Sequence, residues 1–204
     1  AASDVYKRQQ YVDEGYTDVI HVPINRSGSS TYNNAVMAQG MLREERPEHH
    51  LNIHLLDPHT YSMVFGWYLC EMARKLQNGA ELRHVISEFE TQMNKMEIIL
   101  GPYSLKQMKK SGRISAAAAV MGELMGIRPI ITLIDGKTRV ESKVRGDDKV
   151  IPAMIDLCKK RTEGVEDFDY MIGHTSIPQA AELEKACRKA FGKAPLTTFN
   201  LGGV

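Results

Sequence analysis

Residues 17–31 read TDVIHVPINRSGSST, and they contain the clearest sign of the fold class in the chain. Its first part, TDVIHVPI, is an apolar run rich in β-branched residues, which predicts a strand over residues 17–24. Residues 25–30 are polar and include Gly28, which predicts a loop. A strand that leads through a short loop into a helix is the unit from which layered α/β folds are built.

The residues after this loop have the spacing of a helix. Apolar side chains recur on one side of it at Tyr32, Ala35, Ala38, Met41 and Leu42. Residues 51–57 (LNIHLLD) predict a second strand, and residues 61–78 predict a helix that is apolar nearly all round at its start, which indicates burial.

The alternation of strands and helices continues to the end of the chain, so we expect an α/β protein. Asp135-Gly136 suits the two-residue turn of a β-hairpin. Further strands are expected at residues 97–101, 168–173 and 196–201, the hairpin at 129–144, and further helices at 82–96, up to 110, 114–125, 147–161 and 179–191.

The pattern changes near residues 97–101, and we expect a domain boundary there. Residues 10–97 are expected to be the C-terminal part of a first α/β lobe. Residues 98–204 are expected to be a second α/β lobe, truncated at its end. Residues 1–9 (AASDVYKRQ) resemble the translated adaptor sequence found at the ends of assembled reads, so we expect them to lie outside the fold and the true N-terminus to be missing.

Composition excludes several classes of protein. The net charge is +1, from 26 basic and 25 acidic residues, so a nucleic acid is not expected as the main partner. No apolar run approaches the roughly 20 residues of a membrane span, so stable membrane insertion is not expected. The 3 cysteines are far apart, fit no metal site or disulfide framework, and are expected to be buried thiols of a cytoplasmic protein.

The loop after the first strand is the main candidate for a binding site. Ligands of open α/β sheets bind beyond the carboxyl ends of the strands, and a helix N-terminus attracts anions. The hydroxyl groups of this loop add hydrogen-bond donors, and Gly28 allows close approach of the backbone. Alternatively, Ser29 or Ser30 only caps the helix. The loop matches neither of the common phosphate-binding motifs.

Two further segments carry basic residues. Residues 109–114 (KKSGRI) end one helix and begin another, and residues 143–146 (KVRG) follow the hairpin. Both segments also have a purely structural explanation. Lysines in the last turn of a helix interact favourably with the helix dipole, and residues 143–146 would form the solvated end of a strand. The chain contains neither a GxSxG nor an HExxH motif, so we expect no catalytic residue and no metal ligand.

Taken together, these segments resemble the DegV family, whose members include the fatty-acid-binding subunits of bacterial fatty-acid kinase. The family's Ser-Gly-Thr-Tyr and Lys-Lys-Gly-Gly-Arg-Ile-Ser motifs are matched by residues 29–32 (SSTY) and 109–115 (KKSGRIS). Residues 126–130, 135–136 and 143–146 follow in the family's order and spacing, and the similarity runs from about Tyr16 to Val204.

The resemblance implies a two-lobed DegV-like fold of layered sheets and helices, with a long-chain fatty acid in a tunnel between the lobes. Ser29, Ser30 and Thr31 would bind its carboxylate. Arg113, Lys143 and Arg145 would face a kinase that phosphorylates the lipid. On this reading the protein is not an enzyme and needs no cofactor besides the bound fatty acid.

Two alternatives stay open at this stage. The first is a phosphotransferase or other α/β enzyme that acts on a small anion at the Ser29 loop, and it would need acid–base residues and usually a Mg²⁺ carboxylate site. The second is a regulatory protein without a ligand.

The sequence departs from the family pattern at two glycines, which are Ser30 and Ser111 here. If residue 30 needs a positive φ, a serine there costs energy; otherwise its hydroxyl is available to contact the head group. The resemblance also implies that an opening strand with an Asp-Ser motif, a Thr-Ser pair and a C-terminal histidine segment lie beyond the two ends of this sequence.

Overall fold

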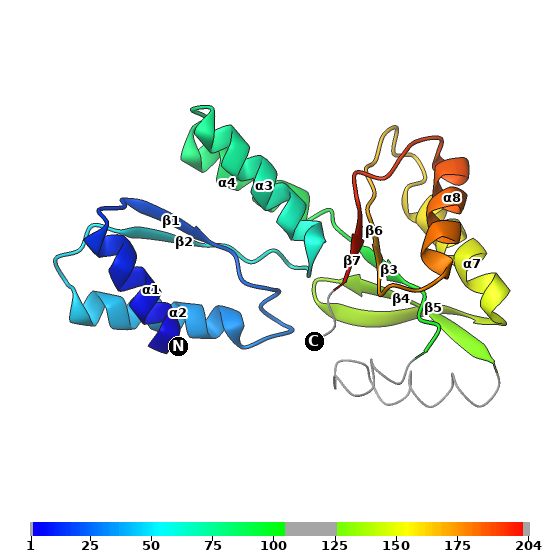
Figure 1. The fold of residues 1–204 in the computed structure, drawn as a ribbon, viewed down its shortest axis with the longest axis horizontal. Coiled ribbons are helices and arrows are strands. Elements are labelled where there is room, and N and C mark those ends of the chain that lie inside the picture. Colours follow the sequence, from blue (N-terminus) through cyan, green and yellow to red (C-terminus); the bar gives the residue numbers. More distant parts are fainter. Residues whose placement is uncertain (1, 105–125, 202–204) are drawn as a thin grey trace. The chain divides into compact units, whose positions relative to one another are not determined.

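A computed structural model describes residues 2–104 and 126–201. The chain forms two compact units, which are residues 1–96 and residues 97–204 (Figure 1). The expected helices up to residue 110 and at 114–125 lie outside the described residues.

The first unit contains one pair of parallel strands and four helices within the described residues. Its elements are α1 (Ala2–Asp13), β1 (Asp18–His21), α2 (Thr31–Glu45), β2 (Asn52–Leu55), α3 (Met63–Gln77) and α4 (Leu82–Met93). β1 and β2 pair in parallel, from Asp18 opposite Asn52 to His21 opposite Leu55. Parallel neighbours need a crossover connection, and α2 provides it.

Helix α1 departs from the sequence-based expectation. Residues 2–9 were expected to lie outside the fold, yet they are helical, and α1 packs against α2 (Figure 1). Val5 and Arg8 are 5% and 3% exposed. The Arg8 guanidinium donates to the carbonyl oxygen of Ala35 at 2.7 Å, and its other terminal nitrogen lies 2.9 Å from His21 Nδ1. Val5 and Arg8 are three residues apart and therefore lie on the same face of α1, and Arg8 on this face contacts α2.

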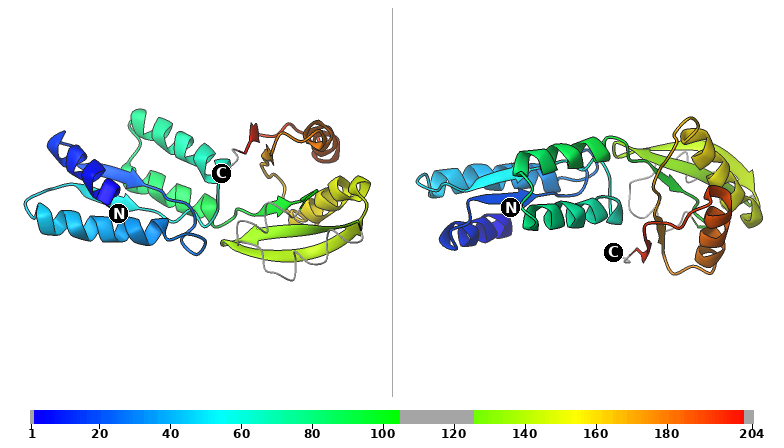
Figure 2. Two further views of the ribbon diagram at one scale, coloured as in Figure 1. Left: turned by 60° about the horizontal axis from the view of Figure 1, so that its bottom comes forward. Right: turned by 90° about the horizontal axis from the view of Figure 1, so that it is seen from above.

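Helices α3 and α4 lie side by side and provide most of one buried apolar cluster of the first unit (Figure 2). The buried cluster consists of Leu56, Met72, Val85, Phe89 and Met93. The expected burial of α3 is only partly right. All of α3 lies within the described residues, and Met72 is the one residue of this helix that is buried, while most of the others are half-buried. An apolar helix that packs on one helix neighbour buries only one stripe.

The second unit combines an antiparallel sheet with a separate parallel pair. The sheet has the order β3 (Ile98–Leu100), β4 (Ile127–Ile134), β5 (Lys137–Arg145). The parallel pair is β6 (Ile172–His174) and β7 (Thr198–Asn200), and the helices are η1 (Asp147–Lys149), α7 (Val150–Arg161) and α8 (Gln179–Phe191). The predicted hairpin is confirmed, with positive φ at both turn residues, 48° at Asp135 and 71° at Gly136.

Strand β4 and helix α7 provide most of the buried side chains in the described part of the second unit. Ile130, Ile131 and Val150 are at most 1% exposed. The close packing is clearest at Gly101, where an added Cβ would lie 2.5 Å from Val150 Cγ1. No side chain larger than hydrogen fits there without displacing α7.

An arginine on α7 joins two strands of the sheet. Arg161 Nε lies 3.3 Å from Glu97 Oε1, and Arg161 Nη2 lies 3.0 Å from Glu141 Oε1. Burial raises the pKa of Glu97, although Arg161 opposes the shift. The two carboxylates therefore hold α7 against β3 and β5.

None of the helices within residues 2–104 and 126–201 has both the length and the apolar character that a bilayer crossing requires. The same ranges contain no group of three or more His, Cys, Asp and Glu side chains arranged to hold a metal ion.

The three cysteines differ in exposure. The expectation of three buried thiols is wrong for Cys70, which is exposed, while Cys158 is half-buried and Cys187 is buried. Burial raises the pKa of the Cys158 thiol, and it raises the pKa of the Cys187 thiol to about 11.

We predict that iodoacetamide at pH 8 modifies Cys70 first and Cys187 last, because the thiolate is the reacting species and the Cys187 thiol is buried with a raised pKa. Mass spectrometry of tryptic peptides over time measures the order. In denaturant, all three thiols should react at similar rates. A native Cys187 that reacts as fast as Cys70 would contradict the described packing.

Candidate functional site

Two loops meet at the carboxyl ends of β1 and β2. We call residues 25–31 the Ser29 loop and residues 57–62 the Tyr61 loop. The Asn25 backbone N–H donates to the Thr60 carbonyl at 3.2 Å, and the Arg26 N–H donates to Asp57 Oδ1 at 3.2 Å. The two loops therefore support each other at the edge of the sheet where α/β proteins bind ligands.

Asn25 shapes the Ser29 loop from inside. Its side chain is completely buried. Its Oδ1 accepts hydrogen bonds from the Ser27 N–H at 2.8 Å, the Ser27 hydroxyl at 2.7 Å and the Gly28 N–H at 3.1 Å. Among the described residues, the buried Nδ2 of Asn25 has no hydrogen-bond partner. The sequence predicts only a loop that begins at Asn25, although asparagine is a typical residue for such side-chain turns.

Ser29 lies at the start of α2, as expected. Its Oγ accepts from the Thr31 N–H at 3.2 Å and lies 2.6 Å from Thr31 Oγ1. The hydrogen bond between the two hydroxyls uses one proton, so the other hydroxyl can still donate to a further acceptor. Ser29 thus acts as a cap for α2 and leaves a donor at the helix N-terminus, so the capping and binding readings do not exclude each other.

Ser30 stands where the family motif has a glycine, but its backbone is not strained. Its φ and ψ are −70° and −5°, which any residue adopts. Its side chain makes no capping hydrogen bond, and both Ser30 and Thr31 are exposed. The structure therefore brings Ser29, Ser30 and Thr31 together at the helix start, with two of the three side chains facing solvent.

The Tyr61 loop contains two residues with unfavourable backbone conformations. His59 has a φ of 55°, and Ser62 has a φ of 63° with a ψ of −151°, a region that glycine alone adopts readily. Each costs about 1–3 kcal/mol. Asp57 Oδ1 accepts the His59 N–H at 2.9 Å and supports the first of these turns.

Tyr61 packs directly on the Ser29 loop. A Cβ added to Gly28 would overlap the Tyr61 hydroxyl and lie 2.8 Å from Cζ of the ring. Tyr61 was not singled out from the sequence. The residues around Tyr61 in the sequence do not indicate this role, because Gly28, which Tyr61 contacts, lies on the loop that follows the neighbouring strand.

Of the residues expected to face a kinase, two can be placed. Lys143 and Arg145 are exposed on β5, opposite Pro129 and Ile127 of β4. They lie two residues apart, so they share one face of the sheet. Arg113 and the whole 109–115 motif lie outside the described residues.

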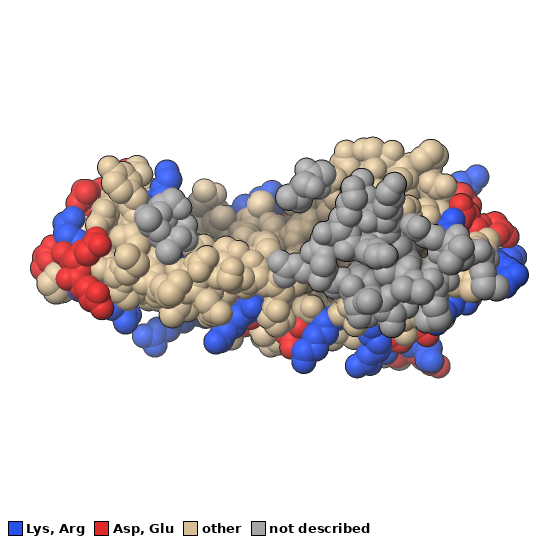
Figure 3. Space-filling model, turned by 90° about the horizontal axis from the view of Figure 1, so that it is seen from below, with Lys and Arg blue, Asp and Glu red and all other residues tan. Residues whose placement is uncertain are grey.

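Helix α2 exposes an apolar stripe beyond the Ser29 loop. Val36, Met37 and Met41 are 48%, 54% and 40% exposed, so Met41 does not lie on the buried side as expected. The buried side of α2 is formed by Ala35, Ala38 and Leu42. Seen from below Figure 1, the first unit has few charged side chains along α2 (Figure 3).

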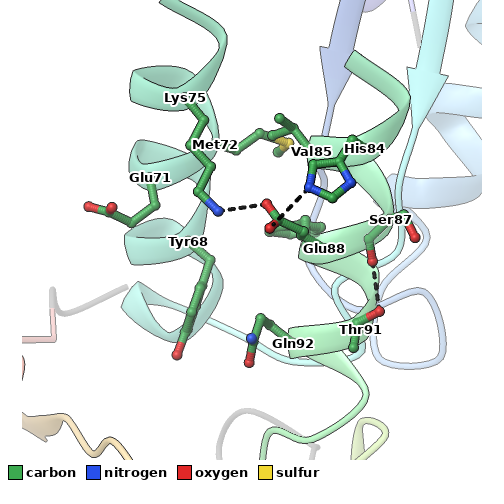
Figure 4. Close-up of a pocket in the computed structure, with 11 residues that line it drawn as sticks. Tyr68, Glu71, Met72, Lys75, His84, Val85, Ser87, Glu88, Thr91 and Gln92 are labelled. Atoms are coloured by element: carbon green, nitrogen blue, oxygen red, sulfur yellow. Dashed lines mark hydrogen bonds and ion pairs between the residues drawn. The ribbon is translucent and has the colours of Figure 1, made fainter. Parts of the chain in front are cut away.

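A shallow groove of about 380 Å³ lies between α3 and α4 (Figure 4). Lys75 Nζ lies 2.6 Å from Glu88 Oε2, and His84 Nε2 lies 3.4 Å from Glu88 Oε1. These charged groups meet on the groove surface, so it offers a lipid tail no continuous apolar lining.

Comparison with known proteins places the chain in a family. A family model for uncharacterised proteins of the DegV family matches residues 2–204. The chain belongs to the DegV family. It is 31% identical over 180 residues to a DegV domain-containing protein of Clostridium acetobutylicum, covering 88% of this chain and 62% of that protein. A second, from Clostridium perfringens, is 30% identical over 152 residues, covering 74% of this chain and 53% of the relative.

Solved structures of similar proteins share the α/β fold. A fatty-acid-binding DegV family protein of Streptococcus agalactiae superposes with a TM-score of 0.83 at 26% identity, covering 100% of this chain and 70% of that one. A stearic-acid-binding protein of Eubacterium ventriosum gives a TM-score of 0.82 at 22% identity, covering 96% and 67%. This chain therefore spans between 53% and 70% of the length of these four relatives.

We predict that Asn25→Ala destabilises the first unit by about 1–3 kcal/mol, because two N–H groups and a hydroxyl lose a buried acceptor. Asn25→Asp keeps the acceptor and should cost less. Urea unfolding followed by circular dichroism measures both. The matched control is Asn94→Ala at the exposed end of α4, which should stay within about 0.5 kcal/mol of wild type. Equal effects at Asn25 and Asn94 would contradict the role assigned to Asn25.

Proposed function

We propose that this DegV family protein binds a long-chain fatty acid and holds its carboxylate at the Ser29 loop, through Ser29, Ser30 and Thr31. The observation that carries the proposal is the group of hydroxyls at the N-terminus of α2, beside a parallel strand pair. Such a helix end attracts a carboxylate. Two similar proteins of known structure support the choice of ligand, because one is described as a fatty-acid-binding DegV family protein and the other as a stearic-acid-binding protein.

The surroundings of the loop favour an amphipathic ligand over a small anion. The hydroxyls lie at one end of α2, and Val36, Met37 and Met41 are exposed further along the same helix. At about 1.5 Å of rise per residue, the helix from Thr31 to Met41 is about 15 Å long, comparable to much of an extended acyl chain. The expected tunnel for the tail stays a prediction.

The head and the tail of the lipid would contribute differently. Each buried methylene gives about 0.8 kcal/mol, so a long acyl chain gives roughly 10 kcal/mol before association costs. A hydrogen bond to the carboxylate gives about 1.5–3 kcal/mol. Affinity would therefore come mainly from the tail, whereas the Ser29 loop would fix the orientation of the carboxylate.

The alternative is an enzyme that acts on a small anion at the same loop. The two proposals differ in how strongly the affinity should depend on the acyl chain of the ligand. A fatty-acid carrier should bind palmitate far more tightly than acetate, whereas an enzyme for small anions should not depend on the acyl chain.

We predict that Ser29→Ala weakens palmitate binding about ten- to a hundredfold, because one charged hydrogen bond is lost. Isothermal titration calorimetry of the protein, after removal of any bound lipid, measures the affinity. The matched control is Ser87→Ala, at an exposed position on α4, which should bind palmitate as the wild type does.

A second variant separates binding from capping. Ser29→Asp keeps a strong helix-capping acceptor but sets a negative charge against the carboxylate. We expect it to keep the melting temperature near that of the wild type and to lose palmitate binding. If Ser29→Asp binds palmitate like the wild type, Ser29 is only a cap and the carboxylate lies elsewhere.

We further propose that the bound lipid is presented to a kinase, with Arg113, Lys143 and Arg145 on the docking side, and that this chain catalyses nothing itself. Lys143 and Arg145 are exposed and share one face of β5. Arginine in particular suits the recognition of carboxylate and phosphate groups on a partner.

We predict that the double change Lys143→Glu and Arg145→Glu lowers phosphorylation of bound palmitate at least tenfold, with unchanged palmitate affinity, in an assay with a bacterial fatty-acid kinase catalytic subunit and radiolabelled ATP. Lys137→Glu is the control, because Lys137 is exposed at the other end of β5, opposite Ile134. Wild-type phosphorylation by the double variant would exclude docking here. A joint loss of binding and phosphorylation would indicate a structural role instead.

A further inference from the structure

The hydroxyl end of the Tyr61 side chain lies against Gly28, the one glycine of the Ser29 loop. A Cβ on Gly28 would overlap the Tyr61 hydroxyl and would lie 2.8 Å from Cζ and 3.3 Å from Cε1. Contacts of this kind mean that the ring already touches the Gly28 backbone. Position 28 therefore tolerates only glycine while the ring stays in place.

The contact adds a second support to a loop that the Asn25 side chain already holds. On the inner side, Asn25 Oδ1 accepts the Ser27 and Gly28 N–H groups. In addition, the hydroxyl end of Tyr61 packs against Gly28, which precedes Ser29 directly. The segment just before the two hydroxyls is thus fixed by hydrogen bonds and by packing at once.

The backbone around Tyr61 is held in an unfavourable shape. Ser62, the next residue, has a φ of 63° and a ψ of −151°, and His59 has a φ of 55°. Such conformations persist only where the surroundings enforce them, and they cluster at functional sites. Here they direct the chain from β2 so that Tyr61 meets Gly28 before α3 begins.

We infer that Tyr61 is a positioning residue, whose ring on Gly28 holds the Ser29 loop in the shape that offers the Ser29 and Thr31 hydroxyls to an oxyanion. This inference rests on the proposed function for the ligand, which is the carboxylate of a fatty acid. A loop ordered before the ligand arrives loses little freedom on binding, so its donors contribute more to affinity. Tyr61 acts through the loop and not by touching the reacting or bound group.

A double-mutant cycle at residues 28 and 61 tests the inference. The variants are Gly28→Ala, Tyr61→Leu and both together, each measured for palmitate affinity by calorimetry. Gly28→Ala should weaken binding at least tenfold, because the ring must leave. In the Tyr61→Leu background, Gly28→Ala should cost less than threefold, because the overlapping ring is absent. Tyr61→Phe keeps the ring but loses the hydroxyl that lies nearest Gly28, so its loss of affinity should be smaller than that of Tyr61→Leu.

The loop can also be followed without any lipid. Amide hydrogen exchange of Ser27, Gly28 and Thr31 reports on the hydrogen bonds within the loop. We expect at least tenfold faster exchange in Gly28→Ala and in Tyr61→Leu, and a smaller increase in Tyr61→Phe, which loses only the hydroxyl. Gly40→Ala on α2 is the control, since a Cβ there meets nothing within 4 Å. It should leave both exchange and affinity unchanged.

The outcomes separate the two proposals. If Gly28→Ala binds palmitate and exchanges like the wild type, or if its effect is the same with tyrosine and leucine at position 61, the positioning role is wrong. If the wild type binds no palmitate while the exchange cycle behaves as expected, the lipid proposal fails, and Tyr61 still orders the loop, for another oxyanion.

Discussion

The hydrogen bonds accepted by the buried Asn25 side chain are the constraint on which the candidate site depends. They turn the chain sharply after β1, so that the Ser29 loop folds back and α2 begins with its hydroxyls at the edge of the sheet. The parallel pairing of β1 and β2 then brings the Tyr61 loop to the same edge. Without the turn at Asn25, neither Ser29 nor the contact at Gly28 would be in place.

The two supports of the loop have different physical origins. The Asn25 hydrogen bonds are local and act within four residues, so they form as soon as the chain turns. The Tyr61 contact joins segments that are 33 positions apart, and strained backbone at Ser62 accompanies it. A local turn is cheap in chain entropy, whereas a long-range contact forms only when β1 and β2 have already paired.

The second unit shows how one irregular residue changes which side chains share a face. The register of β4 and β5 shifts between Ile130 and Ile131, which lie opposite Ser142 and Val140. Glu141 between them has no opposite residue and binds Arg161 of α7. Simple alternation would put Arg139 and Lys143 on one face of β5, but the bulge puts them on opposite faces. The side of the sheet that carries Lys143 is therefore set by this bulge.

The sequence by itself determined the α/β class, most of the described elements and the loop that carries Ser29, because periodicity and turn residues act over a few neighbouring positions. It also indicated the family. Only the tertiary structure decided that residues 2–9 form a packed helix, that Cys70 is exposed, and that Tyr61 rests on Gly28. Each of these depends on which segments meet across the fold. Such contacts are set by strand pairing and helix packing, and they leave no mark on the local pattern of residues.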